Sequence, residues 1–210
     1  MDHSELCVIA ARWLKASKQS KRGAACQVAF IEPRISFMGG ESPDAIGFRI
    51  SSGIDGGSTV VECKVSRSDF LADRKKPHRS SGGMGKWRYM LCPEGLIDPH
   101  ELLPGWGLLY VGNRNKVKPV HGPASLKNSW SEEYEKSLQD FSHENDAFRE
   151  TLMLGNLLHR IGDAKALNTR LRNAEGANQR LIRDLNRKDE QLRELEHEKW
   201  TKIFELKVAS

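Results

Sequence analysis

The chain has 210 residues, a formal net charge of +5 and a hydrophobic content of 38%. We expect neither a signal peptide, because the N-terminal stretch is amphipathic, nor a membrane span, because no apolar run is long enough. Residues 1–130 hold 19 Lys and Arg against 12 Asp and Glu, a balance of +7, whereas residues 131–210 hold 14 against 16, a balance of −2. A basic first part is typical of a module that binds a polyanion.

The first part of the chain alternates between helix and strand patterns. A helix is expected from Ser4, its N-cap, to about Ser17, and a second helix from Arg67 to about Lys76, capped by Ser66. Strands are expected at residues 25–32, 34–38, 43–50, 58–65, 86–93, 105–112 and 116–123. The Gly-rich turn SSGIDGG predicts that two of these strands, 43–50 and 58–65, form an antiparallel hairpin. The pattern predicts an α/β domain over residues 1–125, with a mixed sheet flanked by helices.

The second part, residues 131–207, has a helical pattern with a break expected at Gly162 and Asp163. Past that break, heptad a and d positions continue for over four heptads: Ala164, Leu167, Leu171, Ala174, Asn178, Leu181, Leu185, Lys188, Leu192 and Leu195. We expect a coiled coil that forms a homodimer. Asn178, at an a position, either fixes the register of a two-stranded coiled coil or is a tolerated polar residue in the seam. A helical hairpin at Gly162 is the alternative to one continuous helix.

The cysteines show no metal-binding or redox spacing. None of Cys7, Cys26, Cys63 and Cys92 forms a C-x-x-C pair, so we expect buried, reduced thiols, which fit the cytoplasm. The scattered residues His78, His100 and His121 have no ligand spacing relative to these cysteines. A zinc site built from them is therefore not expected.

Two charged residues on one strand give the first indication of a functional site. Residues two apart on a strand point to the same face, so Glu62 and Lys64 share one face, while Val61, Cys63 and Val65 point into a core. The hairpin brings Asp44 beside Glu62. Two adjacent carboxylates favour a hard divalent cation such as Mg²⁺, and the backbone carbonyl of Cys63 is a candidate further ligand.

Taken alone, Glu62 and Lys64 are most simply interpreted as an exposed ion pair. Asp44, which lies 18 residues before Glu62, favours a functional site instead. Pro43-Asp44 followed by Glu62-Cys63-Lys64 resembles the PD-(D/E)xK nuclease superfamily, whose core is a mixed sheet flanked by helices, the restriction-endonuclease-like fold. The longer run VECKVSRSDFLADRKKP is similar to the MmcB-like and related phage branch of that superfamily. The resemblance covers about residues 1–123 and does not extend to the coiled coil.

The resemblance implies hydrolysis of DNA phosphodiester bonds that depends on Mg²⁺ or Mn²⁺. It implies Asp44 and Glu62 as metal ligands and Lys64 as the catalytic lysine that assists the attacking water. Many such nucleases carry a further Glu on the first helix, and Glu5 is the matching position here. Glu32 and Glu41 are its rivals as an additional ligand.

Basic residues follow the candidate strand directly and predict a nucleic-acid surface: Arg67, Lys75, Lys76, His78, Arg79, Lys86 and Arg88. For any one of them, a solvated helix face is an equally good interpretation. Trp87 and Tyr89 alternate with Arg88 and fit a core better than a base-stacking face. DNA is the expected substrate, with RNA as the other candidate polymer. The alternative function is a non-catalytic nucleic-acid-binding module whose coiled coil recruits a partner.

Overall fold

The computed structural model describes residues 1–18, 23–33, 42–79, 82–126 and 131–208. They fall into two compact units, residues 1–157 and residues 158–210. The strand expected at residues 34–38 lies outside the described residues. We treat each unit by itself.

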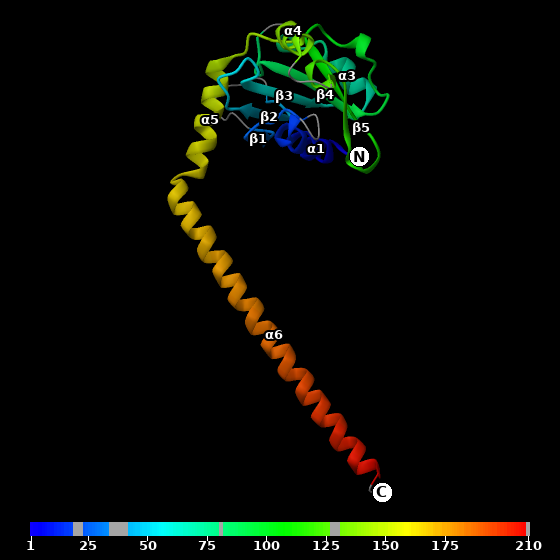
Figure 1. The fold of residues 1–210 in the computed structure, drawn as a ribbon, viewed down its shortest axis with the longest axis vertical. Helices are drawn as coiled ribbons and strands as arrows, with labels where there is room; N and C mark the ends of the chain where they lie inside the picture. Colours follow the sequence, from blue (N-terminus) through cyan, green and yellow to red (C-terminus); the bar gives the residue numbers. More distant parts are fainter. Residues whose placement is uncertain (19–22, 34–41, 80–81, 127–130, 209–210) are drawn as a thin grey trace. The chain divides into compact units, whose positions relative to one another are not determined.

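The first unit contains a six-stranded mixed sheet in which the strands lie in chain order (Figure 1). Its strands are β1 (Val28–Ile31), β2 (Ala45–Arg49), β3 (Gly57–Cys63), β4 (Trp87–Pro93), β5 (Trp106–Val111) and β6 (Val117–His121). Strands β1, β2 and β3 are antiparallel neighbours, β3, β4 and β5 are parallel, and β6 returns antiparallel to β5. The predicted α/β class and the predicted hairpin of β2 and β3 are therefore confirmed.

Helices cover both faces of the sheet. Helices α1 (His3–Lys15) and α4 (Glu132–Asp140) share a core cluster with Val61 and Cys63 of β3. On the opposite face, α3 (Arg67–Asp73), which joins β3 to β4, and α5 (Ala147–Ile161) contribute Phe70 and Met153 to two further clusters. The alternation of β3 gives it one apolar face towards α1 and a second face on which Glu62 lies.

Short 3-10 turns also lie between these elements: η1 (Pro77–Arg79), η2 (Pro99–Glu101), η3 (Asn113–Asn115) and η4 (Pro123–Ser125). Trp87 and Tyr89 are buried, as expected for core residues. The four cysteines are also free and buried, as predicted.

The two helix caps differ in how well the sequence predicted them. Ser66 caps α3 as expected, with its Oγ accepting a hydrogen bond from the Asp69 amide at 3.2 Å. Helix α1 begins earlier than predicted, because Asp2 rather than Ser4 is its N-cap and forms a capping box with Glu5. A carboxylate at this position accepts from the free amides of the first turn, which fixes the helix start.

The boundary of the first unit lies beyond the expected position near residue 125. Tyr134 and Leu138 of α4 pack into the cluster beneath α1, and Met153 of α5 packs against Ile46 and Val60 of the sheet. The helical pattern that we assigned from residue 131 onwards to the coiled-coil region therefore belongs, up to Leu157, to the unit that contains the sheet. Tyr134, Leu138 and Met153 are buried in the clusters of this unit, whereas Phe148 is exposed.

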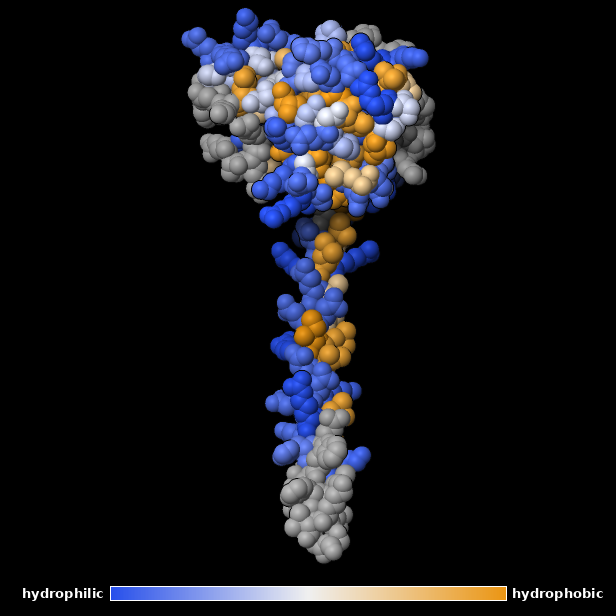
Figure 2. All heavy atoms as spheres, turned by 90° about the vertical axis from the view of Figure 1, so that its right-hand side faces the viewer, coloured by the Kyte–Doolittle hydropathy of each residue, from blue (hydrophilic) through white to orange (hydrophobic). Residues whose placement is uncertain are grey.

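The second unit consists mainly of one helix, α6 (Ala164–Val208), which follows the break predicted at Gly162 and Asp163. Gly162 has a φ of +66°, a left-handed conformation that glycine adopts at little cost at the end of a helix. The Asp163 carboxylate accepts hydrogen bonds from the first amides of α6. The seam leucines of α6 are exposed in a single chain, and hydrophobic side chains recur along the helix in Figure 2. No described helix is long and apolar enough to cross a membrane.

Candidate active site

The candidate site forms where β2 begins and β3 ends, at the same edge of the sheet. Ala45 pairs with Val61 in the antiparallel register, which puts Asp44 level with Glu62 across the two strands. Val61 and Cys63 lie in the core on the α1 side, so Glu62 is on the opposite face, as the alternation predicted. Val65 differs from the prediction: it follows the end of β3 and is exposed.

Asp44 is held by two neighbours. Its Oδ2 accepts a hydrogen bond from the Cys63 amide at 2.7 Å, and its Oδ1 lies 3.3 Å from His3 Nε2. The first contact joins the start of β2 to the end of β3, and the second joins it to the first turn of α1. Asp44 therefore has a fixed orientation at the point where three elements meet.

Glu62 is buried inside an ion-pair network. Its Oε2 lies 2.6 Å from Arg79 Nη2 and 3.7 Å from Lys64 Nζ, and its side chain is only 3% exposed. Its Oε1 is buried and has no hydrogen-bond partner within the described part of the chain. A buried carboxylate oxygen without a partner costs free energy, so this atom is the natural point for a further ligand.

The surroundings of Glu62 shift its ionisation. Burial raises the pKa of Glu62, and although Arg79 and Lys64 lower it, the nearby charges of Asp44 and Asp73 add to the increase, so that the pKa reaches about 8. Burial disfavours the charged carboxylate because water no longer solvates it. A cation that binds here would favour the ionised form.

Asp73 completes the network and was not predicted as a site residue. It is the last residue of α3, and its Oδ2 lies 3.5 Å from Lys64 Nζ and 2.9 Å from Arg79 Nε. Burial by itself raises the pKa of Asp73, but hydrogen bonds from Arg79 and Lys76 outweigh it and leave the pKa below its usual range. The sequence carried one signal: Asp73 is three residues after Phe70, on the same buried face of α3.

The other predicted ligands have different surroundings. Glu5 is 61% exposed and belongs to the capping box of α1, where its carboxylate accepts from the Asp2 amide at 2.8 Å. Cys63, whose carbonyl we considered as a ligand, donates its amide to Asp44 and buries its thiol in the core. Glu41 lies outside the described residues. Glu32 lies beside His3, with 3.7 Å between Glu32 Oε1 and His3 Nδ1.

Two of the predicted nucleic-acid contacts are buried instead. Arg79 is 2% exposed, pairs with Glu62 and Asp73, and lies over the ring of Trp106. Arg88 is also 2% exposed and donates to backbone carbonyls of the loop before β4: those of His78, Gly82, Gly83 and Gly85. Their sequence context was misleading because one side chain pairs with buried acids and the other with backbone carbonyls, and neither partner is evident from the basic composition of the segment. Neither guanidinium is placed to contact a phosphate.

The other predicted contacts are at or near the surface. Arg67 makes a bidentate pair with Glu101 at 2.6 Å, Lys76 Nζ lies 2.6 Å from Asp73, and Lys86 Nζ donates to the carbonyls of Ile54 and Gly56. Lys75 is exposed, and His78 is half-buried. Arg67, at the start of α3, and Lys75 and Lys76, in the turn after it, are thus exposed cations, two of which are already paired with acids.

Comparisons with known proteins do not identify a family. No family model and no curated protein matches the chain. A solved structure described as the SPO1766 protein of unknown function from Silicibacter pomeroyi is similar to it at 22% sequence identity, with a TM-score of 0.40. The similarity covers 77% of this chain and 95% of that one.

Proposed function

We propose that the first unit is a metal-dependent nuclease that hydrolyses DNA phosphodiester bonds. The observation that carries the proposal is the buried Glu62 Oε1, which has no hydrogen-bond partner among the described residues. The register of β2 and β3 puts Glu62 level with Asp44, which directly precedes β2. A partnerless carboxylate oxygen beside a second carboxylate is expected where a cation binds. Lys64, 3.7 Å from Glu62, supplies the third group of the proposed site.

The donors fit a hard divalent cation. Asp44 and Glu62 offer carboxylate oxygens, which Mg²⁺ and Mn²⁺ prefer, and Mg²⁺ typically takes one or two protein carboxylates and keeps several waters. Asp44 and Glu62 would hold the cation, with the carbonyl of Cys63 as a further candidate. When bound, such a cation supplies an activated water and neutralises charge on the phosphate.

The chain's own cations would act on the phosphate and on the attacking water. Lys64 lies between Glu62 and Asp73, at 3.7 and 3.5 Å, so its ammonium is held in place before any substrate arrives. A preorganised donor stabilises charge that develops in the transition state without reorganising. Arg79 holds Glu62 and Asp73 together and is a positioning residue in this proposal.

The order of elements supports the resemblance to the PD-(D/E)xK superfamily. One helix, a three-stranded antiparallel meander, a crossover helix and a parallel strand position Asp44 and Glu62 at one edge of the sheet. The basic first part and the exposed cations Arg67, Lys75 and Lys76 favour a nucleic acid as substrate. Free, buried cysteines fit a reducing cytoplasm.

A homodimer formed through α6 belongs to the same proposal. The exposed leucines at a and d positions would be buried in a two-stranded coil, and two active sites could then act on one duplex. Asn178 lies within this seam and would favour a single register.

A second function, a non-catalytic nucleic-acid-binding module whose coil recruits a partner, is favoured by a different observation. Arg79 lies 2.6 Å from Glu62, so part of the carboxylate is already neutralised by the protein. An ion-pair network of this kind can serve the fold alone.

The test is cleavage of labelled single- and double-stranded DNA in Mg²⁺, Mn²⁺ or EDTA. We expect cutting that requires the metal and falls by about 100-fold or more in Lys64→Ala and Glu62→Gln. Lys118→Ala and Glu94→Gln, which change an exposed pair, are the matched controls. Intact DNA binding with no cutting under any condition would refute the nuclease and support the binding module.

A further inference from the structure

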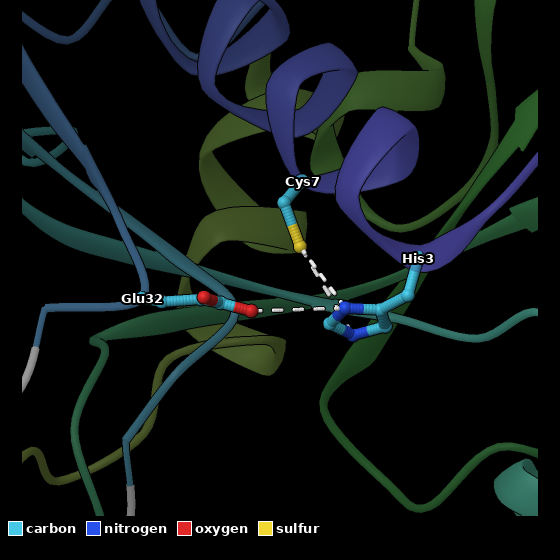
Figure 3. A group of neighbouring side chains, drawn as sticks. All are labelled: His3, Cys7 and Glu32. Carbon is cyan, nitrogen blue, oxygen red and sulfur yellow. Dashed lines mark hydrogen bonds and ion pairs between the residues drawn. The ribbon is translucent and has the colours of Figure 1, made fainter.

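A histidine, a cysteine and a glutamate meet beside Asp44. His3 and Cys7 lie one turn apart on α1, and Glu32 directly follows β1. One donor atom from each lies within 4.8 Å of both others, and Figure 3 shows the Cys7 thiol and the Glu32 carboxylate directed at the ring of His3. This cluster has imidazole, thiol and carboxylate donors, unlike the oxygen donors of the candidate active site.

The spacing of the donors matches the ligands of a tetrahedral zinc ion. Cys7 Sγ lies 3.6 Å from His3 Nδ1, and Glu32 Oε1 lies 3.7 Å from the same nitrogen. Ordinary Zn–S, Zn–N and Zn–O bond lengths at tetrahedral angles require about 3.5 Å between sulfur and nitrogen and about 3.4 Å between nitrogen and oxygen. Both distances from His3 Nδ1 therefore differ from those of a tetrahedral zinc site by only tenths of an ångström.

The other nitrogen of His3 has the partner that a metal ligand needs. Nε2 lies 3.3 Å from Asp44 Oδ1, so the carboxylate can accept the Nε2 proton and leave the Nδ1 lone pair directed at the cluster. A carboxylate behind a metal-binding histidine fixes the tautomer and the orientation of the ring in this way. Asp44 thus orients His3 without being a ligand of this site.

Backbone geometry and charge agree with a bound cation. Glu32 has a φ of +41°, which is uncommon for a residue with a side chain, and its amide is fixed to the Asp44 carbonyl at 3.0 Å. Cys7 is 1% exposed, so its thiolate would be a buried charge. Together with the Glu32 carboxylate, it carries the two negative charges that a divalent cation compensates.

We propose that His3 Nδ1, Cys7 Sγ and Glu32 Oε1 bind one zinc(II) ion, with a water in the fourth position. A thiolate and an imidazole select a borderline metal such as zinc over Mg²⁺. The bound ion would fasten the first turn of α1 to the end of β1 and, through His3, would orient Asp44. None of its three ligands is Asp44, Glu62 or Lys64, the proposed catalytic residues, so the zinc site does not depend on the proposed nuclease activity.

The test uses the full chain, reduced and freed of metal, titrated with Co²⁺ and followed by absorption. We expect one equivalent to bind with visible bands of tetrahedral cobalt and a thiolate-to-cobalt charge-transfer band, and Zn²⁺ to displace it. Cys7→Ser should abolish the charge-transfer band, whereas Cys92→Ser, which removes a buried thiol from the opposite face, should leave it unchanged. Asp44→Asn should weaken binding about 10- to 100-fold while the band persists.

His3→Gln and Glu32→Gln keep the test decisive if Cys7→Ser does not fold, because both side chains are at least 39% exposed. Each should weaken Co²⁺ binding at least about 10-fold, with circular dichroism to verify the fold. The Cys63 thiol, whose pKa is raised by a hydrogen bond with Cys7 and by burial, is the neighbouring alternative ligand. The absence of a thiolate band, a band that is lost in Cys63→Ser but kept in Cys7→Ser, or unchanged affinity in His3→Gln would each overturn the proposal.

Discussion

Glu62 combines burial with four charged neighbours, and this combination defines the candidate site at the scale of a single residue. A buried carboxylate loses its hydration, and Arg79 and Lys64 compensate only part of that loss, so its pKa is raised to about 8. A buried apolar side chain such as valine would also fit this position of β3, yet the protein has an ionisable group there. A group retained at such a cost is expected to have a role beyond the fold.

The raised pKa of Glu62 predicts a pH-dependent stability. Between the ordinary value of 4.5 and about 8, the folded chain holds a proton that the unfolded chain has released, so stability falls as pH rises. The slope is at most about 1.4 kcal/mol per pH unit. Glu62→Gln removes this slope, and urea unfolding in EDTA from pH 5 to 9 should show the wild type losing stability relative to the variant. Parallel curves over this range would contradict the assignment.

At the scale of the element, α5 is joined to the sheet by a buried carboxylate. Glu150 Oε1 accepts from Ser58 Oγ at 2.7 Å and from the Gly85 amide at 2.8 Å. These contacts connect α5 with the start of β3 and with the loop that precedes β4. They explain why α5 packs on the sheet although its apolar spacing resembles that of the helix that follows.

Glu150→Ala should destabilise the first unit by about 1–3 kcal/mol, because it leaves the Gly85 amide without its acceptor in a buried position. Glu150→Gln keeps an acceptor oxygen and should recover part of the loss. Glu133→Ala, which removes an exposed carboxylate from α4, serves as the control. Urea unfolding followed by circular dichroism measures the difference, and equal midpoints for Glu150→Ala and Glu133→Ala would refute the anchoring role.

At the scale of the whole molecule, α6 is a long helix whose leucines need a partner. An isolated amphipathic helix gains most of its stability from packing its apolar face. The a and d seam provides that face, and the break at Gly162 separates it from the helices that pack on the sheet. A second copy of α6 is the partner that we propose.

The proposed dimer predicts the effect of charges in the seam. Leu181→Glu with Leu185→Glu places acids at a d and an a position, so four buried leucines per dimer are lost and the dissociation constant should rise by more than about 100-fold. Gln179→Glu introduces the same charge at a neighbouring position outside the seam and should leave the dimer intact. Sedimentation equilibrium distinguishes the two states. A wild-type chain that is monomeric at micromolar concentrations would contradict the prediction.

Local patterns in the sequence were sufficient for much of the fold. Alternation placed Glu62 and Lys64 on the face opposite Val61 and Cys63, because strand geometry depends only on neighbouring residues. The Gly-rich turn predicted the antiparallel hairpin, and Gly162 predicted the helix break for the same reason. Heptad spacing indicated a coiled coil but could not separate it from α5, since a helix uses similar spacing to pack on a sheet.

Contacts between individual side chains were decided only by the tertiary structure. Arg79 and Arg88 had the composition of a phosphate-binding surface, yet one compensates buried acids and the other binds loop carbonyls. Asp73 and His3 became site residues only in the structure. Helix α3 brings Asp73 to Lys64, and helix α1 brings His3 to Asp44. Sequence by itself determined which residues could carry charge at this edge of the sheet. Packing determined which of those charges face each other, because burial and pairing depend on segments that are far apart along the chain.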